Sequence, residues 1–343
     1  MKELVVISGK GGTGKTSTTA SLAVLAGRCV VADCDVDAAD LHLVLSPKVL
    51  DRHDFYSGHQ AVIREEDCSG CGACLAHCRF GAISSRAPAE ELDGGLRAAR
   101  YDCENCIVCR RSCPARANDM IHAMSVAMGV AGGGGFSVDP VACEGCGVCV
   151  NLCPEKAIDF RPRLCGEWFV SQTRCGTMVH AKLGIAQSNS GKLVSTVRQE
   201  ARRAAEKQDV PMIIVDGPPG IGCPVIASVT GASMMLAVAE PTLSGEHDLK
   251  RVLQLARHFG IPSALCINKW DLNPDIAARI EAYCREQSVP LAGRIRYDRA
   301  FTHAQIQRQT VVEMSEDGVA ADIRAVWAAV VAQLECGRAE VRA

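Results

Sequence analysis

The chain has 343 residues, a formal net charge of −2 and 20 cysteines, and 48% of its residues are apolar. This length is sufficient for two domains with buried cores, and the nearly neutral charge argues against strong electrostatic attraction to nucleic acid or anionic lipid. No apolar run has the length of a membrane span and the first residues enter a strand without a signal peptide, so we expect a cytoplasmic protein with no nucleic-acid partner and no stable membrane binding.

The number of cysteines is informative for a chain of this kind. Disulfides are disfavoured in the cytoplasm, so dense cysteine there indicates metal or redox chemistry. Twelve of the 20 cysteines fall in three regular clusters, and the other eight are scattered. Because buried cysteine is common as a small core residue, most of the scattered ones need no functional explanation.

The chain opens with an apolar, β-branched segment at 3–8, which predicts a buried strand, and a helix-like stretch follows at 15–27. Between them, residues 9–16 read GKGGTGKT and fit the phosphate-loop pattern G-x-x-x-x-G-K-[ST] in its required strand–helix context. Glycines allow successive backbone N–H groups to turn towards phosphate oxygens, and the helix N-terminus adds a favourable dipole.

Two side chains of this loop have specific predicted roles. Lys15 is expected to reach the β- and γ-phosphates, and the Thr16 hydroxyl is expected to bind Mg²⁺. The residues predicted to contact the nucleotide here are Gly9, Gly11, Gly12, Thr13, Gly14, Lys15, Thr16 and Ser17.

A second short apolar run at 29–33 predicts another buried strand, and the alternation of such runs with helices indicates a parallel sheet covered on both faces. This pattern stops near residue 64, where cysteine, glycine and arginine become frequent, and it returns near residue 164. We therefore divide the chain into an ATPase domain at 1–63 and 164–343 and an insert at 64–163.

The insert contains three copies of C-x2-C-x2-C-x3-C. Three thiolates on one tight loop can face three irons of a [4Fe–4S] cubane, and in two-cluster ferredoxins the fourth cysteine binds the other cluster. Zinc is the alternative, but zinc sites use pairs of cysteines. The predicted cluster ligands are Cys68, Cys71, Cys74, Cys78, Cys103, Cys106, Cys109, Cys113, Cys143, Cys146, Cys149 and Cys153.

The first and third motifs, with CRFGAI at 78–83 and CPEKAI at 153–158, resemble the two halves of a bacterial ferredoxin, although Arg79 stands where proline is usual. The resemblance implies that these halves pair and exchange their fourth ligands, which gives two clusters. The middle motif either holds a third cluster or is vestigial.

After the insert, short apolar runs at 211–215, 232–239 and 263–267 predict strands, and 192–208, 246–259, 275–287 and 319–335 predict helices. The fold class is therefore α/β, a mostly parallel P-loop NTPase sheet with helices on both faces, plus a ferredoxin-like α+β insert. We expect Arg202 and Arg203 to lie on a solvated helix face. The last helix lacks a basic face, so its apolar positions indicate core packing rather than membrane binding.

The second lysine of the loop, Lys10, completes KGGTGKT, which resembles the deviant P-loop family of MinD, ParA, the Mrp-type carriers and the nitrogenase iron protein. The resemblance implies that Lys10 crosses a dimer interface to the partner's nucleotide, as an arginine finger does in other NTPases. Two chains, identical or paralogous, would then sandwich two ATP molecules and hydrolyse them slowly, stimulated by a partner.

Two acidic segments resemble the switches of that family. In DCDVDAADLHL at 33–43, Asp35 matches the aspartate that orients the attacking water, and Asp33 and Asp40 are candidates for indirect Mg²⁺ contact. In DGPPGIG at 216–222, Asp216 matches the Walker B acid. A turn or helix cap is the alternative for a single aspartate at a strand end.

Residues 268–271 read NKWD, which is also the guanine-reading pattern of GTPases. In the MinD/ParA group the equivalent asparagine contacts adenine, and because Lys10 places the chain there, we expect Asn268 to bind the base of ATP rather than of GTP.

Cys223 lies seven residues after Asp216, an offset that resembles the cluster-binding cysteine of the nitrogenase iron protein. A second cysteine per chain, which a bridging site would need, is not identifiable. Both readings of Cys223 stay open, as a structural thiol or as a bridging ligand.

Three functions fit these parts. We expect a dimeric ATPase that couples ATP to electron transfer through [4Fe–4S] clusters, with a redox protein as its partner. The first alternative is an ATP-dependent cluster carrier that delivers clusters to an acceptor protein. The second is a MinD/ParA-type spatial-positioning ATPase.

Overall fold

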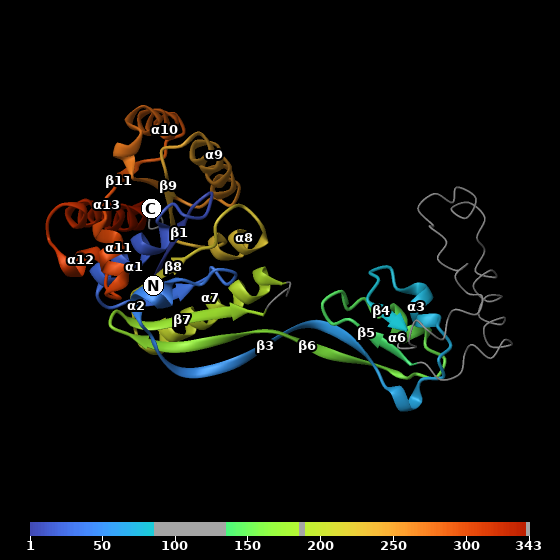
Figure 1. Cartoon of the computed structure of the whole chain (residues 1–343). Helices are drawn as coiled ribbons and strands as arrows, with labels where there is room; N and C mark the ends of the chain where they lie inside the picture. Colours follow the sequence, from blue (N-terminus) through green and yellow to red (C-terminus); the bar gives the residue numbers. More distant parts are fainter. Residues whose placement is uncertain (86–134, 185–188, 341–343) are drawn as a thin grey trace. The chain divides into compact units, whose positions relative to one another are not determined.

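The computed structural model describes residues 1–85, 135–184 and 189–340 (Figure 1). The chain divides into two compact units. Unit 1 comprises Met1–Phe55 and Cys165–Ala343, and unit 2 comprises Tyr56–Leu164. The middle cysteine motif lies outside the described residues; it consists of Cys103, Cys106, Cys109 and Cys113.

A nine-stranded sheet has the strand order β11-β10-β9-β1-β8-β2-β7-β6-β3. The strands from β11 to β7 are parallel, and β6 is antiparallel to β7 through Gly166–Thr173. Their bounds are β1 Lys2–Ile7, β2 Val30–Asp33, β3 Lys48–Ile63, β6 Ile158–Thr173, β7 Gly176–Leu183, β8 Met212–Asp216, β9 Met234–Ala239, β10 Ser263–Asn268 and β11 Leu291–Ile295.

Helices cover both faces of the parallel part of this sheet (Figure 1). One layer consists of α7 Ser190–Lys207, α8 Cys223–Val229, α9 Leu243–His258 and α10 Pro274–Glu286. The other consists of α1 Lys15–Ala26, α2 Leu41–Leu45, α11 Ala300–Ile306, α12 Val311–Met314 and α13 Val319–Glu340. Alternate residues of a strand face opposite sides, and accordingly Val5 and Ile7 pack in the first layer's core and Leu4 and Val6 in the second's. The predicted α/β fold with a mostly parallel sheet is confirmed.

The last helix, α13, packs against the sheet as predicted, because Ile323, Val326 and Val330 are fully buried in the core of the second layer. Across the described parts of the chain, no helix combines the length and the apolar character that crossing a bilayer requires.

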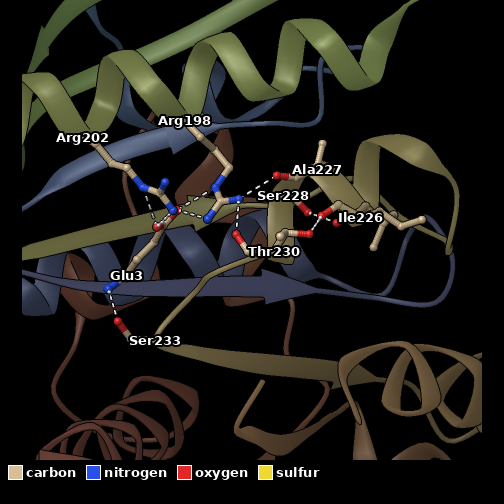
Figure 2. Close-up of polar contacts among 9 residues, drawn as sticks. Glu3, Arg198, Arg202, Ile226, Ala227, Ser228, Thr230 and Ser233 are labelled. Atoms are coloured by element: carbon tan, nitrogen blue, oxygen red, sulfur yellow. Dashed lines mark hydrogen bonds and ion pairs between the residues drawn. The ribbon is translucent and has the colours of Figure 1, made fainter. Parts of the chain in front are cut away.

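A buried ion-pair network joins α7 to the start of β1 (Figure 2). Arg198 Nε donates to Glu3 Oε1 at 2.7 Å, and Arg202 Nη2 donates to Glu3 Oε2 at 2.6 Å. Arg198 Nη1 also donates to the carbonyls of Ala227 and Thr230, where α8 ends. A solvated helix face was expected for the Arg202–Arg203 pair, and this prediction is wrong for Arg202 because its guanidinium is bound to a buried carboxylate.

Four strands of the nine-stranded sheet escaped the sequence analysis, namely β3, β6, β7 and β11. Most residues of β3 are exposed, with only Phe55, Ser57 and Ala61 buried, so its sequence lacks the apolar alternation by which a half-buried strand is recognised.

In the described part of unit 2, the short helices α3 Ala73–His77 and α6 Val148–Leu152 pack against each other. Strands β4 Ile83–Ser85 and β5 Phe136–Val138 form a two-stranded antiparallel sheet, and a 3₁₀ turn, η1, spans Glu65–Asp67. The small core of this unit contains Ile83, Phe136 and Ile158 together with Cys74 and Cys143.

Candidate functional site

The phosphate loop connects the buried strand β1 to helix α1 at the carboxyl end of the sheet. Gly12 and Gly14 have φ values of 80° and 84°, a left-handed backbone that favours glycine. A side chain at Gly14 would overlap the amide of Asn268, and one at Gly9 would overlap Asp248. The loop is therefore wound tightly against α9 and the end of β10.

Lys15, the first residue of α1, lies among acidic side chains. Its Nζ is 2.7 Å from Asp216 Oδ1 and 3.6 Å from Asp35 Oδ2, and its side chain is 6% exposed. Burial lowers the pKa of Lys15, but the neighbouring carboxylates, Asp216 foremost, outweigh burial and raise it. Lys15 is therefore a fixed positive charge at the start of the helix.

Asp216 ends β8 and is fully buried. Its Oδ2 accepts from Thr16 Oγ1 at 2.8 Å, and its Oδ1 accepts from Thr19 Oγ1 at 2.9 Å. The structure thus brings together Lys15, Thr16, Asp35 and Asp216, as the sequence predicted for a nucleotide site. Thr19, one turn further along α1, was missed, although its position four residues after Lys15 places it on the same helix face.

Asp33 ends β2 beside Asp216 in the parallel register, and it is fully buried. Its Oδ1 accepts from the backbone N–H of Asp35 at 3.1 Å, whereas its Oδ2 has no hydrogen-bond partner among the described residues. Burial, followed by the charge of Asp216, raises the pKa of Asp33 well above its usual value. Burial also raises the pKa of Asp35.

These groups favour a divalent cation nearby. When ionised, three carboxylates (Asp33, Asp35 and Asp216) against one ammonium (Lys15) would leave two excess negative charges in a largely buried place, and Mg²⁺ at such sites takes one or two protein oxygens and completes its shell with phosphate and water. The Oδ2 of Asp33, which has no hydrogen-bond partner among the described residues, could then contact the Mg²⁺ ion directly or accept a hydrogen bond from a water bound to that ion.

A second unpartnered group lies in the loop itself. Thr13 is 2% exposed, and its Oγ1 has no hydrogen-bond partner in the described part of the chain. A buried hydroxyl normally finds a partner, and beside a glycine-rich turn of N–H donors a phosphate oxygen would provide one.

Asn268, at the end of β10, supports the phosphate loop. Its Nδ2 donates to the Thr13 carbonyl at 2.7 Å, and its Oδ1 accepts from the N–H of Lys269 at 3.0 Å. Lys269 Nζ donates to the Gly12 carbonyl at 3.1 Å. The structure therefore places Asn268 beside the loop, and its expected contact with adenine stays a prediction.

Lys10 occupies the outer side of the loop, with a side chain that is 32% exposed. Its Nζ donates to the hydroxyls of Thr242 and Ser244 at 3.3 and 3.2 Å, and it lies 3.8 Å from Glu240 Oε2. All three partners follow β9, and the sequence analysis identified none of them. One feature of the sequence could have indicated them. Their segment directly follows a buried strand, and open α/β sheets bind ligands at the carboxyl ends of their strands.

The other predicted residues make contacts of their own. Ser17 Oγ accepts from Gln305 Nε2 of α11 at 2.8 Å, and Gly11 has open space where a side chain would lie. In the second acidic segment, the N–H of Gly217 donates to the Val6 carbonyl and that of Gly220 to the Ser8 carbonyl. Cys223 is exposed at the start of α8.

In unit 2, eight predicted ligand cysteines line two hollows. Each hollow combines three cysteines of one motif with the last cysteine of the other motif, which is the exchange that the ferredoxin resemblance implied. The first is lined by Cys68, Cys71, Cys74 and Cys153, and the second by Cys78, Cys143, Cys146 and Cys149.

Within residues 1–85, 135–184 and 189–340, no three His, Cys, Asp or Glu side chains converge closely enough to hold a single metal ion. A [4Fe–4S] cluster has one thiolate on each of four irons, so its ligands surround a hollow instead of converging on a point. The donor type and the arrangement of the eight cysteines fit such clusters, and the ferredoxin-like module remains a prediction.

Comparisons with known proteins agree with the fold and with the phosphate loop. Residues 4–311 match the family described as the CobQ/CobB/MinD/ParA nucleotide binding domain. The uncharacterized protein MJ0578 of Methanocaldococcus jannaschii is 30% identical over 278 residues, which is 79% of each chain.

Solved structures show the same architecture. The cell division ATPase MinD of Pyrococcus furiosus superposes with a TM-score of 0.51 at 16% identity, over 97% of this chain and 99% of that one. The septum site-determining protein MinD of Pyrococcus horikoshii, complexed with Mg-ADP, gives 0.51 at 16% identity, over 95% and 94%. Likeness at this level of identity establishes the fold alone.

Proposed function

The chain belongs to the CobQ/CobB/MinD/ParA nucleotide-binding family and is a P-loop ATPase of the MinD/ParA type, and from this premise we propose that ATP binding pairs two chains. The observation that carries the proposal is the position of Lys10, which is partly exposed on the outer side of the phosphate loop and bound to its own chain by contacts that can exchange. Hydrolysis would separate the pair. Partners in the pair are two identical chains or one chain and a paralogue.

The residues of the site would divide the work of hydrolysis. The loop N–H groups and Lys15 would bind the phosphates, and Asp35 would orient the attacking water. Thr16 and Asp216 would hold Mg²⁺, which when bound neutralises phosphate charge. Asn268 would bind adenine. The Mg-ADP bound by the Pyrococcus horikoshii protein supports an adenine nucleotide over a guanine nucleotide.

Steady-state hydrolysis by the full chain tests this function. We expect ATP to be hydrolysed faster than GTP, at a rate per chain that rises with protein concentration because each site needs a partner's lysine. Asp35→Asn should lower kcat by about 100-fold or more, whereas Asp37→Asn, an exposed control two residues away, should match the parent. A rate per chain that is independent of concentration, or an unaffected Asp35→Asn variant, would refute the proposal.

A second candidate function concerns the two hollows of unit 2, and the observation that favours it is their crossed set of cysteines. We propose that each hollow holds a [4Fe–4S] cluster. When bound, such a cluster can accept and donate one electron. The cysteines would supply thiolates, and the core around Phe136 and Ile158 would limit access of water.

Three roles remain for an ATPase with these clusters. The relatives described above include cell-division ATPases and no electron-transfer protein, so the comparisons support a positioning ATPase better than electron transfer. Stable clusters that cycle under dithionite would indicate electron transfer, and labile iron that moves to an apo-protein would indicate a cluster carrier. Nucleotide-dependent binding to liposomes or plasmid DNA would indicate positioning.

Paired substitutions test the crossed arrangement. After anaerobic purification, Cys74→Ser with Cys153→Ser should remove about four irons per chain, because both residues line one hollow. Cys74→Ser with Cys78→Ser should remove about eight, because these residues line different hollows although they share a motif.

The control for this experiment is Cys165→Ser, which alters a buried cysteine outside both hollows and should leave the iron content unchanged. Equal iron losses in the two double variants, or a parent protein that contains no iron, would contradict the crossed clusters.

A further inference from the structure

The loops that follow β1 and β9 are neighbours and contact each other through Lys10 and Glu240. Strands β1 and β9 pair in parallel up to Ile7 and Ala237, so the segments that follow both strands leave the same edge of the sheet. Lys10 lies three residues after β1, and Glu240 is the first residue after β9.

Glu240 lies between two lysines of the phosphate-loop region. Its Oε2 is 3.8 Å from Lys10 Nζ and its Oε1 is 3.9 Å from Lys269 Nζ. The carboxylate is 19% exposed, so it is partly withdrawn from water but not sealed from it. Thr242 and Ser244 complete the surroundings of the Lys10 ammonium with two hydroxyls.

Local hydrogen bonds hold the turn that presents Glu240. The N–H of Thr242 donates to the Glu240 carbonyl at 2.8 Å, and the Thr242 hydroxyl accepts from the N–H of Gly245 at 3.0 Å. A side chain at Gly245 would overlap the Glu240 carbonyl. Neither of these two hydrogen bonds involves Lys10, so the lysine can change partner without breaking them.

From these contacts we propose that Glu240 is a positioning residue that holds Lys10 on its own chain until ATP and a second chain are present. The inference rests on the proposed function, in which Lys10 contacts the partner's nucleotide. Lys10 would exchange one carboxylate and two hydroxyls for phosphate oxygens, which carry more negative charge. Glu240 thereby sets the ATP concentration at which chains pair.

Lys269 makes this exchange feasible. Once Lys10 has left, the Glu240 carboxylate keeps the Lys269 ammonium as a counter-ion, so no bare negative charge remains beside the bound phosphates. Because Lys269 also donates to the Gly12 carbonyl, the counter-ion is itself fixed on the loop. The ion pair between Lys10 and Glu240 is long and open to water on one side, so it contributes little stability, which suits a contact that must be released.

The test is the ATP concentration for half-maximal pairing of the full chain, measured by sedimentation in the hydrolysis-deficient Asp35→Asn background. Glu240→Gln should lower that concentration by about two- to fivefold, and the difference should shrink as salt is raised. Glu240→Asp should return it towards the parent value. The control is Glu246→Gln, which removes a buried carboxylate of α9 that binds Lys250 and Arg279. This variant should leave the ATP concentration for half-maximal pairing unchanged.

Glu240→Gln that pairs at the parental ATP concentration, or at a higher one, would overturn the inference. If Glu240 served only to stabilise the fold, Glu240→Gln would raise the ATP concentration needed for half-maximal pairing instead of lowering it. Failure of the parent itself to pair with ATP would overturn the proposed function, so the two failures are distinguishable.

Discussion

Lys10→Ala is expected to lower kcat for ATP hydrolysis by about 1,000-fold or more while the chain still binds ATP. The reason is that Lys10 would supply positive charge to the partner's γ-phosphate, the contribution that arginine fingers make in other NTPases. Its own-chain contacts are partly exposed and long, so its removal should cost the fold little. Hydrolysis at saturating ATP and nucleotide binding by calorimetry measure the two quantities separately.

The control is Lys250→Ala, which removes an exposed lysine that pairs with Glu246 on α9 and should not change kcat. A mixing experiment adds a sharper criterion. Lys10→Ala keeps Asp35, and Asp35→Asn keeps Lys10, so a mixed pair has one complete site. Equal amounts of the two inactive variants should recover about one quarter of the parental activity. No recovery on mixing, or a kcat of Lys10→Ala within tenfold of the parent, would show that Lys10 does not act on the partner.

Arg198→Met is expected to lower the free energy of unfolding of unit 1 by about 3–5 kcal/mol. Arg198 has a side chain that is 6% exposed and binds Glu3, which is 7% exposed. Removing the guanidinium leaves part of a buried carboxylate and two carbonyls at the end of α8 without their donor (Figure 2). Breaking a buried pair from one side is costly for this reason.

Urea denaturation followed by tryptophan fluorescence measures this change. All three tryptophans, Trp168, Trp270 and Trp327, lie in unit 1, so the signal reports that unit alone. The matched control is Arg202→Met, because Arg202 binds the same Glu3 with a side chain that is 40% exposed. We expect the control to lose about 1 kcal/mol or less. Equal losses in both variants would contradict the structural role assigned to Arg198.

The nucleotide site was predictable because its signals are local. The phosphate loop is one continuous segment with a required strand and helix on either side, and Asp33 and Asp216 each end a short apolar run. Parallel strands bring their carboxyl ends to one edge of the sheet, so residues that are 200 positions apart, such as Thr16 and Asp216, could be expected together.

Arg198 shows what local signals cannot supply. An arginine in a charged helix is usually solvated, and nothing near it in the sequence indicates a partner. Its burial depends on Glu3, which is 195 positions away, and on the end of α8. Glu240 escaped notice for a similar reason, since a glutamate after a strand has no distinctive pattern of its own.

The strands β3 and β6 were missed for a different physical reason. A strand is recognised in a sequence by burial on one or both faces. Most residues of β3 are exposed, and β6 mixes exposed, half-buried and buried residues without a strict alternation. In contrast, the exchange of the fourth cysteines between motifs was implied by the ferredoxin resemblance. Cys78 and Cys153 line the hollows of the opposite motifs, and cluster binding there stays a prediction.

The claim that ATP joins two chains is tested most directly by the mass of the full chain in solution, measured under anaerobic conditions. With a non-hydrolysable ATP analogue and Mg²⁺, we predict twice the mass of one chain. If a paralogue is the partner, we predict the mass of the mixed complex when that paralogue is supplied. With ADP we predict the mass of one chain. A single-chain mass at saturating analogue, in the presence and in the absence of a paralogue, would contradict the account.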